Sequence, residues 1–572
     1  MSGPVALDPV YRADTWSRVT AEPADLLVIG GGVTGAGIAL DAATRGLKVV
    51  LVEQSDLAAG TSSRSSKLFH GGLRYLEQLN FSLVREALRE RELMLTRLAP
   101  HLVKPVRFLY PLQHRVWERP YVTAGLTLYD AMGGKSSLPR HKQLTRTQAL
   151  RLAPGLRGDA LAGALAYYDA QADDARHTMM VARTAASYGA SVLTSARVIG
   201  LEHAGERVVG ARVLDVESGQ EHTIAASVVI NSTGVWTDEI QTLAGGRGRF
   251  HVRASKGVHL VVARDRINSE VGMILRTETS VLFVIPWNTH WIVGTTDTDW
   301  SLDLAHPAAS RTDIDYVLEQ VNRVLSTPLT HDDIQGVYAG LRPLLSGEDD
   351  STSQLSREHA VARPQPGLIS IAGGKYTTYR VMAQDAVDAA RQDLPSGVPD
   401  SVTEDIPLVG AEGYQALVNQ VPRLAVKHGI PQWRVQRLLD RYGSLFSELV
   451  ALAEQEPGLW QPLEKAAEYL RVEARYAVTH EGALHLDDVL ARRTRISIET
   501  PDRGSDSAPE VAAIVAPVLG WDEERVRDEV EAYQARVTAE RDSQRAQEDQ
   551  EANAERLVAP DMRRRAVGRA LA

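Results

Sequence analysis

The fold of this chain is decided by the stretch LLVIGGGVTGAGIALDAATRGLKVVLVE, residues 26–53. The apolar run Leu26–Ile29 predicts a buried strand, and the alanine-rich stretch Ala36–Arg45 predicts a helix. A second apolar run, Lys48–Val52, predicts another buried strand. A strand–turn–helix–strand unit of about 30 residues is typical of one half of a Rossmann-like sheet. We therefore expect an α/β protein with a parallel sheet near its N-terminus.

Three glycines in this stretch have the spacing of a dinucleotide-binding turn. Gly30 permits a tight turn, Gly32 lets the backbone approach a pyrophosphate, and Gly35 lets the helix pack on the sheet. The N–H groups of the helix N-terminus then face the phosphates. Glu53 follows Gly35 by eighteen residues, where a carboxylate binds a ribose diol and repels the 2′-phosphate of NADP. The pattern therefore favours FAD or NAD.

The composition excludes several classes of function. The chain has 572 residues, too many for one hydrophobic core, so we expect two or three domains. A formal net charge of -10 argues against a nucleic-acid partner, because binding a phosphate backbone needs a basic surface. Cysteine is absent, which excludes disulfides, cysteine-ligated iron–sulfur clusters and thiol catalysis. Redox chemistry must therefore use an organic cofactor, and no metal is expected.

Neither end of the sequence resembles a membrane span. Residues 1–16 lack a basic start followed by an apolar run, so we expect no signal peptide. No stretch approaches the roughly 18 uninterrupted apolar residues of a spanning helix. The last stretch, Met562–Ala572, is basic and mildly apolar, so it is either a solvated tail or an electrostatic contact with anionic lipid. We expect a cytoplasmic protein with at most peripheral membrane contact.

The pattern along the chain predicts three parts. Residues 24–400 are expected to form the nucleotide-binding domain, with an antiparallel substrate-binding sheet inserted at about 75–150 and 250–345. Residues 401–540 are expected to form a helical domain. Residues 541–572 read as a charged tail that is either a solvated helix or disordered.

Several shorter elements are also predicted. An amphipathic helix is expected over Ser82–Leu98, and another helix over Asp173–Tyr188. Short strands of the inserted sheet are expected at Val258–Val262, Val281–Ile285 and Trp291–Val293.

The segment GTSSRSSKLFHGGLRY, residues 60–75, separates the two possible cofactors. It is dense with hydroxyl groups and glycines directly after the ribose-binding strand. Such a loop suits a second phosphate and a flat ring, whereas an NAD-dependent dehydrogenase has an ordinary crossover connection at this point. The loop therefore favours FAD, although serine-rich loops are also found as surface linkers.

Five stretches of this sequence resemble the FAD-dependent glycerol-3-phosphate dehydrogenase family. They are TSSRSSKLFHGGLRYLE (61–77), FVIPW (283–287), GTTD (294–297), GLRPL (340–344) and GGKYTTYR (373–380). The matches run in order from about residue 24 to residue 380, and the helical part after residue 400 is similar less specifically. The resemblance implies a D-amino-acid-oxidase-like fold, which consists of an FAD-binding Rossmann-like domain and an antiparallel-sheet substrate domain. An α-helical C-terminal domain follows in this chain.

The same resemblance implies an activity. The family's reaction is the oxidation of sn-glycerol 3-phosphate to dihydroxyacetone phosphate by hydride transfer to FAD, with electrons passed to a quinone. It also implies attachment to the inner face of the cell membrane. We expect the FAD to be non-covalent and the chain to form a homo-oligomer. Three alternatives stay open: an amine or amino-acid oxidase of the same fold, an oxygen-using glycerol-3-phosphate oxidase, and a flavin-bound sensor without turnover.

The resemblance also places four residues around the substrate phosphate: Arg74, Tyr75, Arg342 and Lys375. Two or three cations that face one dianion are the arrangement that phosphate recognition favours. Arg342 is in addition a catalytic candidate. A group that takes the hydroxyl proton is also needed, and His259, on a predicted strand, is the first candidate. The alternative interpretation of His259 is a satisfied core residue.

The remaining predicted residues contact the cofactor. A helix N-terminus with a nearby cation, as in Gly373-Gly374-Lys375, stabilises negative charge on reduced flavin. His70 is a rival for the proton acceptor, but its place before two glycines suits packing against the flavin. The full set of predicted FAD contacts is Gly30, Gly32, Gly35, Glu53, Thr61, Ser62, Ser66, Lys67, His70, Gly71, Gly234, Gly374 and Thr377.

Overall fold

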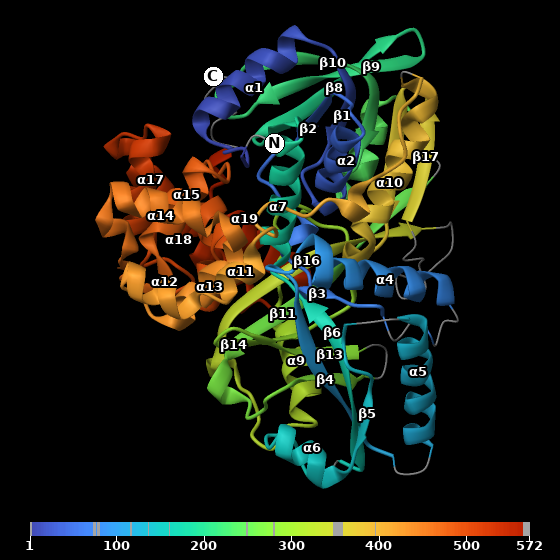
Figure 1. Cartoon of the computed structure of the whole chain (residues 1–572), viewed down its shortest axis with the longest axis vertical. Coiled ribbons are helices and arrows are strands. Elements are labelled where there is room, and N and C mark those ends of the chain that lie inside the picture. Colours follow the sequence, from blue (N-terminus) through green and yellow to red (C-terminus); the bar gives the residue numbers. More distant parts are fainter. Residues whose placement is uncertain are drawn as a thin grey trace.

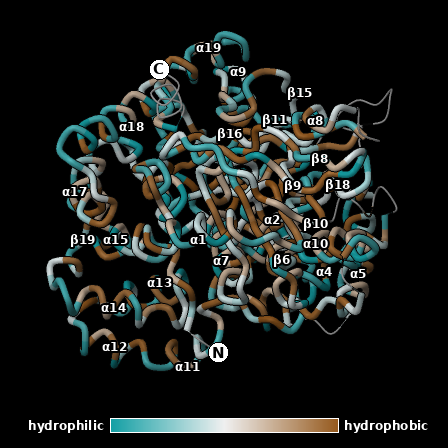
Figure 2. The backbone as a smooth tube through the Cα atoms, turned by 90° about the horizontal axis from the view of Figure 1, so that it is seen from above, coloured by the Kyte–Doolittle hydropathy of each residue, from teal (hydrophilic) through white to brown (hydrophobic). Residues whose placement is uncertain are grey.

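The computed structural model describes residues 3–72, 76, 80–114, 117–134, 137–159, 161–246, 250–277, 281–346, 359–394 and 396–563. Three parts are visible in Figure 1. A sheet covered by helices lies at the top, a second sheet lies below it, and the C-terminal helices, in orange and red, lie at the side. In Figure 2 the hydrophobic segments gather in the central strands and helices, whereas α18 (Glu523–Ser543) at the edge is largely hydrophilic.

The first sheet is of the Rossmann type. Its strands follow the order β17-β18-β10-β1-β2-β7, and the five strands from β18 to β7 are parallel to their neighbours. The strands are β1 (Ala24–Ile29), β2 (Val49–Val52), β7 (Ser191–Leu193), β10 (Glu221–Asn231), β17 (His359–Gln365) and β18 (Leu368–Gly373). The antiparallel strands β8 (Ala196–Ala204) and β9 (Arg207–Asp215) extend it beside β10. Both strands predicted around the glycine motif are confirmed.

Helices cover this sheet on both faces, so its strands are apolar throughout. On one face lie α2 (Val33–Thr44), α7 (Asp174–Ser187) and α10 (Tyr379–Ala390), with α2 between the other two. Their core includes Leu26 and Val28. The other face, with Leu27, packs against α1 (Pro9–Ala21) and against strands β8 and β9. The predicted helices after the first strand and over Asp173–Tyr188 are confirmed.

The second sheet is mostly antiparallel. Its path is β15-β11-β14-β13-β12-β4-β6-β3, while β16 pairs with β11 and β5 with β6. The strands are β3 (Leu68–Phe69), β4 (Lys104–Leu112), β5 (Lys142–Leu144), β6 (Gly163–Gln171), β11 (His251–Ala263), β12 (Gly272–Arg276), β13 (Val281–Trp287), β14 (His290–Gly294), β15 (Thr298–Trp300) and β16 (Ile334–Ser346). The three short strands predicted here lie within β11, β13 and β14.

Side chains alternate between the two faces of this sheet, as the two-residue period of a strand requires. Along β11, Val258 and Leu260 pack on one face against α6 (Arg146–Leu152) and α9 (Arg311–Asn322). Val261 lies on the opposite face, which α5 (Glu118–Met132) covers in part. His259 has the same parity as Val261, so it shares that second face. The predicted helix over Ser82–Leu98 is α4 (Phe81–Leu93), continued by a π-helical turn.

The C-terminal part is largely helical. Its elements are α11 (Tyr414–Val418), α12 (Val421–His428), α13 (Gln432–Tyr442), α14 (Phe446–Gln455), β19 (Pro462–Leu463), β20 (Ala466–Leu470), α15 (Arg471–Thr479), α16 (Ile496–Glu499), α17 (Ala508–Leu519), α18 and α19 (Asp549–Leu557). In the described part of the chain, no helix is long and apolar enough to cross a bilayer.

The expectation of a solvated or disordered tail after residue 541 does not account for one face of the described residues, which is packed against the protein. They complete α18 and form α19, where Ala552 is fully buried and Arg556 is nearly so. The sequence conceals this packing because the contacts are made by small alanines and by an arginine near Glu540 and His306. Residues 564–572 lie outside the described residues.

Buried ion pairs join the C-terminal helices to the first sheet. Asp56, which follows β2, is fully buried and accepts hydrogen bonds from Arg492 and Arg493. Asp174, at the start of α7, is buried beside Arg495 and Lys67. Removing one partner of such a buried pair typically destabilises a protein by about 3–5 kcal/mol. These pairs therefore fix the C-terminal helices against the loops that follow the strands.

Candidate active site

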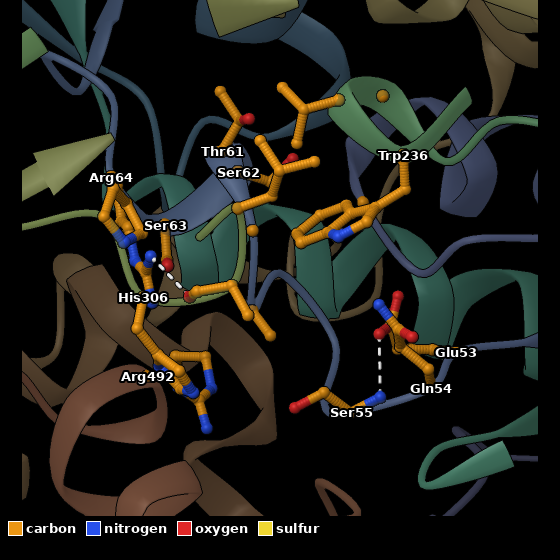
Figure 3. Close-up of a pocket in the computed structure, with 18 of the residues that line it drawn as sticks. Glu53, Gln54, Ser55, Thr61, Ser62, Ser63, Arg64, Trp236, His306 and Arg492 are labelled. Atoms are coloured by element: carbon orange, nitrogen blue, oxygen red, sulfur yellow. Dashed lines mark hydrogen bonds between the residues drawn. The ribbon is translucent and has the colours of Figure 1, made fainter. Parts of the chain in front are cut away.

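One large cavity, of about 1200 Å³, lies at the carboxyl ends of the parallel strands, where α/β sheets bind ligands. Its volume exceeds the roughly 300–1000 Å³ of pockets for drug-sized ligands, so it accommodates a dinucleotide. Figure 3 shows part of its lining. Eight of the predicted residues line it: Gly30, Gly32, Glu53, Thr61, Ser62, Gly234, Gly374 and Lys375.

The glycine turn has the geometry that a pyrophosphate needs. Gly30 has φ +109°, and a Cβ added to Gly35 would lie 1.9 Å from the carbonyl oxygen of Gly30, so neither position accepts a side chain. Gly32 caps α2 without a side chain, and its Cα lies beside the cavity. The N–H of Val33 donates to Ser62 Oγ over 2.9 Å, which fixes the serine loop at the helix N-terminus. The positive end of α2 is thus directed at the cavity.

Glu53 lies at the end of β2 with a defined orientation. Its Oε2 accepts from the N–H of Gly31 over 2.6 Å, and its Oε1 accepts from the N–H of Ser55 over 2.8 Å. Burial raises the pKa of Glu53, and these two N–H groups oppose that rise. A carboxylate offers about four acceptor positions, so the two bonds leave others for the hydroxyl groups of a ribose.

The loop from Thr61 to Lys67 is held by side chains of both sheets. Thr61 Oγ1 donates to the carbonyl of Leu341 on β16 over 2.6 Å. The ammonium of Lys67 donates to Asp174 over 2.7 Å and to the carbonyl of Ser63 over 3.0 Å. Lys67, predicted as a cofactor contact, therefore stabilises this loop through an ion pair and a hydrogen bond.

His259 lies on β11 in contact with the same loop. Its Nε2 is 2.9 Å from Ser66 Oγ, and its ring stacks on Tyr338 of β16 with centroids 4.7 Å apart. The Nδ1 atom is buried and has no hydrogen-bond partner among the described residues. Burial, with smaller contributions from Arg342 and Lys67, holds the pKa of His259 well below its usual range. The imidazole is thus neutral around pH 7, and its stacking partner Tyr338 lines the cavity.

Arg342 lies on the same face of the sheet as His259. The register pairs Ser255 with Arg342 and His259 with Tyr338, so all four side chains point to one side. The guanidinium contacts Asp297 Oδ1 at 3.3 Å and Thr295 Oγ1 at 3.2 Å. A predicted base and a fixed cation, 83 residues apart in sequence, are therefore brought together by the pairing of β11 with β16.

Gly257 is the reason that Arg342 can lie across this face. A Cβ at that position would stand 2.6 Å from the guanidinium and 2.6 Å from Thr295 Oγ1. The guanidinium therefore occupies the volume that a side chain would fill.

The turn before α10 carries the other predicted residues. Gly373 and Gly374 have φ values of +77° and +79°, a left-handed conformation that glycine adopts readily. Thr377 Oγ1 lies 3.3 Å from the N–H and from the carbonyl oxygen of His70. Gly71 is packed against Tyr129, whose hydroxyl accepts its N–H over 2.8 Å. The predicted residues Arg74 and Tyr75 lie outside the described residues.

The sequence did not indicate one wall of the cavity. Arg64, His306 and Arg492 lie together there, opposite Trp236 and Glu53 (Figure 3). Arg64 donates to the carbonyl of Ala305 over 3.2 Å, and burial near Arg556 and Arg492 lowers its pKa to about 10. The sequence assigns no function to Arg64, although it lies in the serine loop. Arg492 lies in a stretch predicted to be helical, where an arginine is expected to be a solvated surface charge.

Known proteins match this chain over nearly all of its length. The family model of FAD dependent oxidoreductases matches residues 25–380, and that of the C-terminal domain of alpha-glycerophosphate oxidase matches residues 401–526. The glycerol-3-phosphate dehydrogenase of Mycobacterium leprae is 62% identical over 562 residues, which are 98% of this chain and 96% of that protein. The chain belongs to the FAD-dependent glycerol-3-phosphate dehydrogenase family. The mouse mitochondrial glycerol-3-phosphate dehydrogenase is 35% identical over 93% of this chain and 75% of its own length.

Solved structures of glycerol-3-phosphate dehydrogenase relatives agree with the fold. The enzyme from Bacillus halodurans, complexed with FAD, aligns with a TM-score of 0.78 at 30% identity, over 93% of this chain and 98% of that one. The L-alpha-glycerophosphate oxidase of Mycoplasma pneumoniae shares the fold at 19% identity and a TM-score of 0.55, over 68% of this chain and 99% of that one. The predicted combination of an FAD-binding domain, a substrate sheet and a helical C-terminal domain is confirmed.

As a member of the glycerol-3-phosphate dehydrogenase family, the chain is an FAD-dependent oxidoreductase. The residues present fit that cofactor. The glycine turn accepts no Cβ, the N-terminus of α2 opens on the cavity, and Glu53 retains acceptor positions. The prediction of FAD is confirmed, and the individual residue assignments stay predictions.

Proposed function

We propose that this chain oxidises sn-glycerol 3-phosphate to dihydroxyacetone phosphate and that the electrons pass on to a quinone. The observation that carries this proposal is that His259 and Arg342 share one face of β11 and β16, and that Tyr338 and Pro343 of β16 line the cofactor cavity. A proton acceptor and a permanent cation then serve one small phosphorylated alcohol. The names of relatives at 62% identity support the substrate.

The cofactor residues have distinct tasks in this proposal. The turn at Gly30 and Gly32, with the N-terminus of α2, holds the pyrophosphate, and Glu53 holds the ribose. The serine loop at Thr61 and Ser62 and the turn at Gly374 hold the rest of the molecule. FAD, when bound, accepts the hydride from the carbinol carbon of the substrate.

Arg342 binds the substrate phosphate, together with Lys375 and, by resemblance to the family, Arg74 and Tyr75. A planar guanidinium suits a phosphate because it donates two parallel hydrogen bonds. Arg342 is already oriented by Asp297 and Thr295, so little of its side-chain freedom is lost when the substrate binds.

His259 takes the hydroxyl proton of the substrate. In the free protein the charge of Arg342 is one cause of the low pKa of His259. A phosphate bound to Arg342 offsets that charge, so the pKa of His259 rises when the substrate arrives. The imidazole is therefore neutral before binding and becomes more basic in the complex.

An anaerobic spectrum tests the reaction. Glycerol 3-phosphate should bleach the absorbance of the bound flavin within one turnover, whereas glycerol and free amino acids should leave it unchanged. Bleaching by an amino acid but not by glycerol 3-phosphate would refute the proposed substrate. The same reduced protein, mixed with a soluble quinone or with oxygen, then identifies the acceptor: rapid reoxidation by oxygen alone would refute the quinone.

Membrane contact at the inner face of the cell membrane is part of the same proposal. Arg563, the first arginine of the predicted basic tail, is engaged with Asp488. A different surface supports lipid contact: Trp117, which directly precedes α5, is exposed on the same side as Tyr121 and Leu128 of α5. Tryptophan and tyrosine are the side chains that favour a membrane–water interface.

A further inference from the structure

The segment from Gln544 to Arg563 forms a wall of the cofactor cavity. Residues 559–563 line it, together with Gln544 and Arg556. This stretch lies beyond residue 526, where the matched C-terminal family model ends. That model therefore does not cover the segment, although the segment lines the cavity.

The segment is packed in place by its helix. Ala546 and Ala552 are buried in a small apolar cluster with Val235, Ala308 and Leu341. Val235 and Ala308 also line the cavity, so the residues that pack against α19 form part of the cavity wall. The backbone carbonyl of Ala546 accepts the N–H of Arg311, at the start of α9, over 2.8 Å. Lifting α19 would therefore open the cavity from this side.

Two aspartates of the segment, Asp549 and Asp561, pair with side chains of neighbouring elements. Asp549 pairs with Lys256, a fully buried lysine of β11 that also donates to Asp313 over 2.6 Å. At the other end Asp561 lies 3.4 Å from the ring of His306, which stands on the cavity wall. The second of these contacts reaches the cavity wall itself.

Arg563 makes the last tie, at the ribose end of the cavity. Its guanidinium pairs with Asp488 at 2.9 Å, and its Nε donates to Ser195 Oγ over 2.8 Å. Ser195 in turn donates its N–H to the carbonyl of Ser55, two residues after Glu53. The segment thus bridges the C-terminal helices and the loop that carries the ribose-binding carboxylate.

We propose that residues 544–563 form a strap that must lift for FAD to enter or leave, so that the ties of Asp561 and Arg563 set how long the cofactor is retained. The reason is geometric. Residues 559–563 line the same cavity as Glu53 and Lys375, and the strap is held by the contacts of Asp549, Asp561 and Arg563. Weakening the ties raises the population of the lifted state and speeds release in proportion.

The test measures release of FAD from the holoenzyme. The variant combining Asp561→Ala with Arg563→Ala is diluted, bound and free flavin are separated by filtration at timed intervals, and each is quantified by absorbance. We expect release at least tenfold faster than from the parent. The matched control is Arg545→Ala, which removes an exposed pair with Asp542 in the same segment and should leave release unchanged. Release within twofold of the parent, with the melting temperature retained, would overturn the proposal.

A thiol probe separates lifting from loss of a mere contact. The chain has no cysteine, so Ala552→Cys introduces a single thiol on the buried face of α19. In the holoenzyme this thiol should react with a thiol reagent no more slowly than FAD is released, and faster once Asp561 and Arg563 are replaced. Ala512→Cys, buried elsewhere in the C-terminal helices, should stay protected and so exclude global unfolding. Release of FAD while the thiol at position 552 stays protected would refute a lifting strap.

Discussion

The ring of His259 lies almost flat on the ring of Tyr338, with the ring planes 11° apart and Ser66 Oγ 2.9 Å from Nε2. This stacking fixes the orientation of the imidazole, and the deep burial keeps it uncharged. A neutral imidazole held in one orientation has a lone pair available for a proton, and in the proposed mechanism it becomes more basic when the substrate phosphate offsets the charge of Arg342.

We predict that His259→Gln lowers kcat for glycerol 3-phosphate by about 10²–10⁴-fold, the usual contribution of a positioned base. Glutamine retains a polar contact with Ser66 but accepts no proton. The measurement is single-turnover flavin bleaching, with FAD content and melting temperature as controls. A loss below about threefold would identify His259 as a core residue.

Arg342→Ala should lower kcat/KM for glycerol 3-phosphate by at least about tenfold, because a charged hydrogen bond is worth roughly 1.5–3 kcal/mol. Arg342→Lys should recover only part of this loss, since an ammonium does not form the two-pronged contact. Plain glycerol should be a poor substrate of the parent and should lose little more in the variant. Equal losses for both substrates would instead assign Arg342 to the reacting hydroxyl.

Replacement of Glu53 should weaken FAD binding even when the shape is conserved. In Glu53→Gln the new NH₂ group must face the backbone N–H of Gly31 or of Ser55. Two hydrogen-bond donors then point at each other, and one of the two hydrogen bonds that orient the side chain is lost. We expect the Kd of FAD, from titration of the apoprotein, to rise about 10–100-fold, with the KM for substrate of the reconstituted enzyme unchanged. An altered KM with an unchanged Kd would show that Glu53 does not bind the ribose.

The protein should lose stability as the pH falls below about 6.5, in part through buried histidines. Burial lowers the pKa of His101 and of His177 from 6.5 to about 3. Between these values the unfolded chain binds a proton at each site that the folded chain does not bind. The free energy of unfolding then decreases by up to about 1.4 kcal/mol per pH unit and site, and neither site contributes above that window.

His101→Phe should therefore make the acid dependence shallower by about one proton. Urea unfolding between pH 7 and pH 4.5 measures this slope. The exposed His203 offers the control, because His203→Phe should leave the slope as in the parent. An identical slope for the two variants would contradict the assignment.

If α5 meets the membrane, replacing Trp117 and Tyr121 by serine should reduce binding to liposomes of anionic lipid. Their side chains are about half exposed, at 52% and 49%. Trp433→Ser is the matched control, since Trp433 is equally exposed, at 49%, on α13 of the C-terminal part. Equal effects of the two changes would exclude a specific role for α5.

Local patterns were enough to predict the first sheet. The spacing of Gly30, Gly32 and Gly35 and the apolar runs beside them are set within about 30 residues, so the strand–helix–strand unit follows from sequence alone. The pairing of Ser255 with Arg342 depends instead on the register of two distant strands, which no local pattern specifies.

The same limit applies to buried charges. The serine loop predicts that Lys67 contacts the cofactor, whereas the partner of its ion pair, Asp174, is more than 100 residues away in the sequence. Nothing in the sequence around Arg492 and Arg495 predicts that they form buried ion pairs. A lone arginine in a helix usually reads as solvated, and only the fold reveals the carboxylates that it neutralises.

The buried carboxylates at Asp56 and Asp174 also decide whether this chain can be divided. A fragment that ends at residue 400 would retain both of them but lose Arg492, Arg493 and Arg495. Asp56 would then be buried without a counter-charge, and Asp174 would keep only Lys67, next to the loops that hold the cofactor. The flavin-binding half is therefore not a separable module: grafted alone onto another protein, it would be expected to need new partners for these acids before it could fold around FAD.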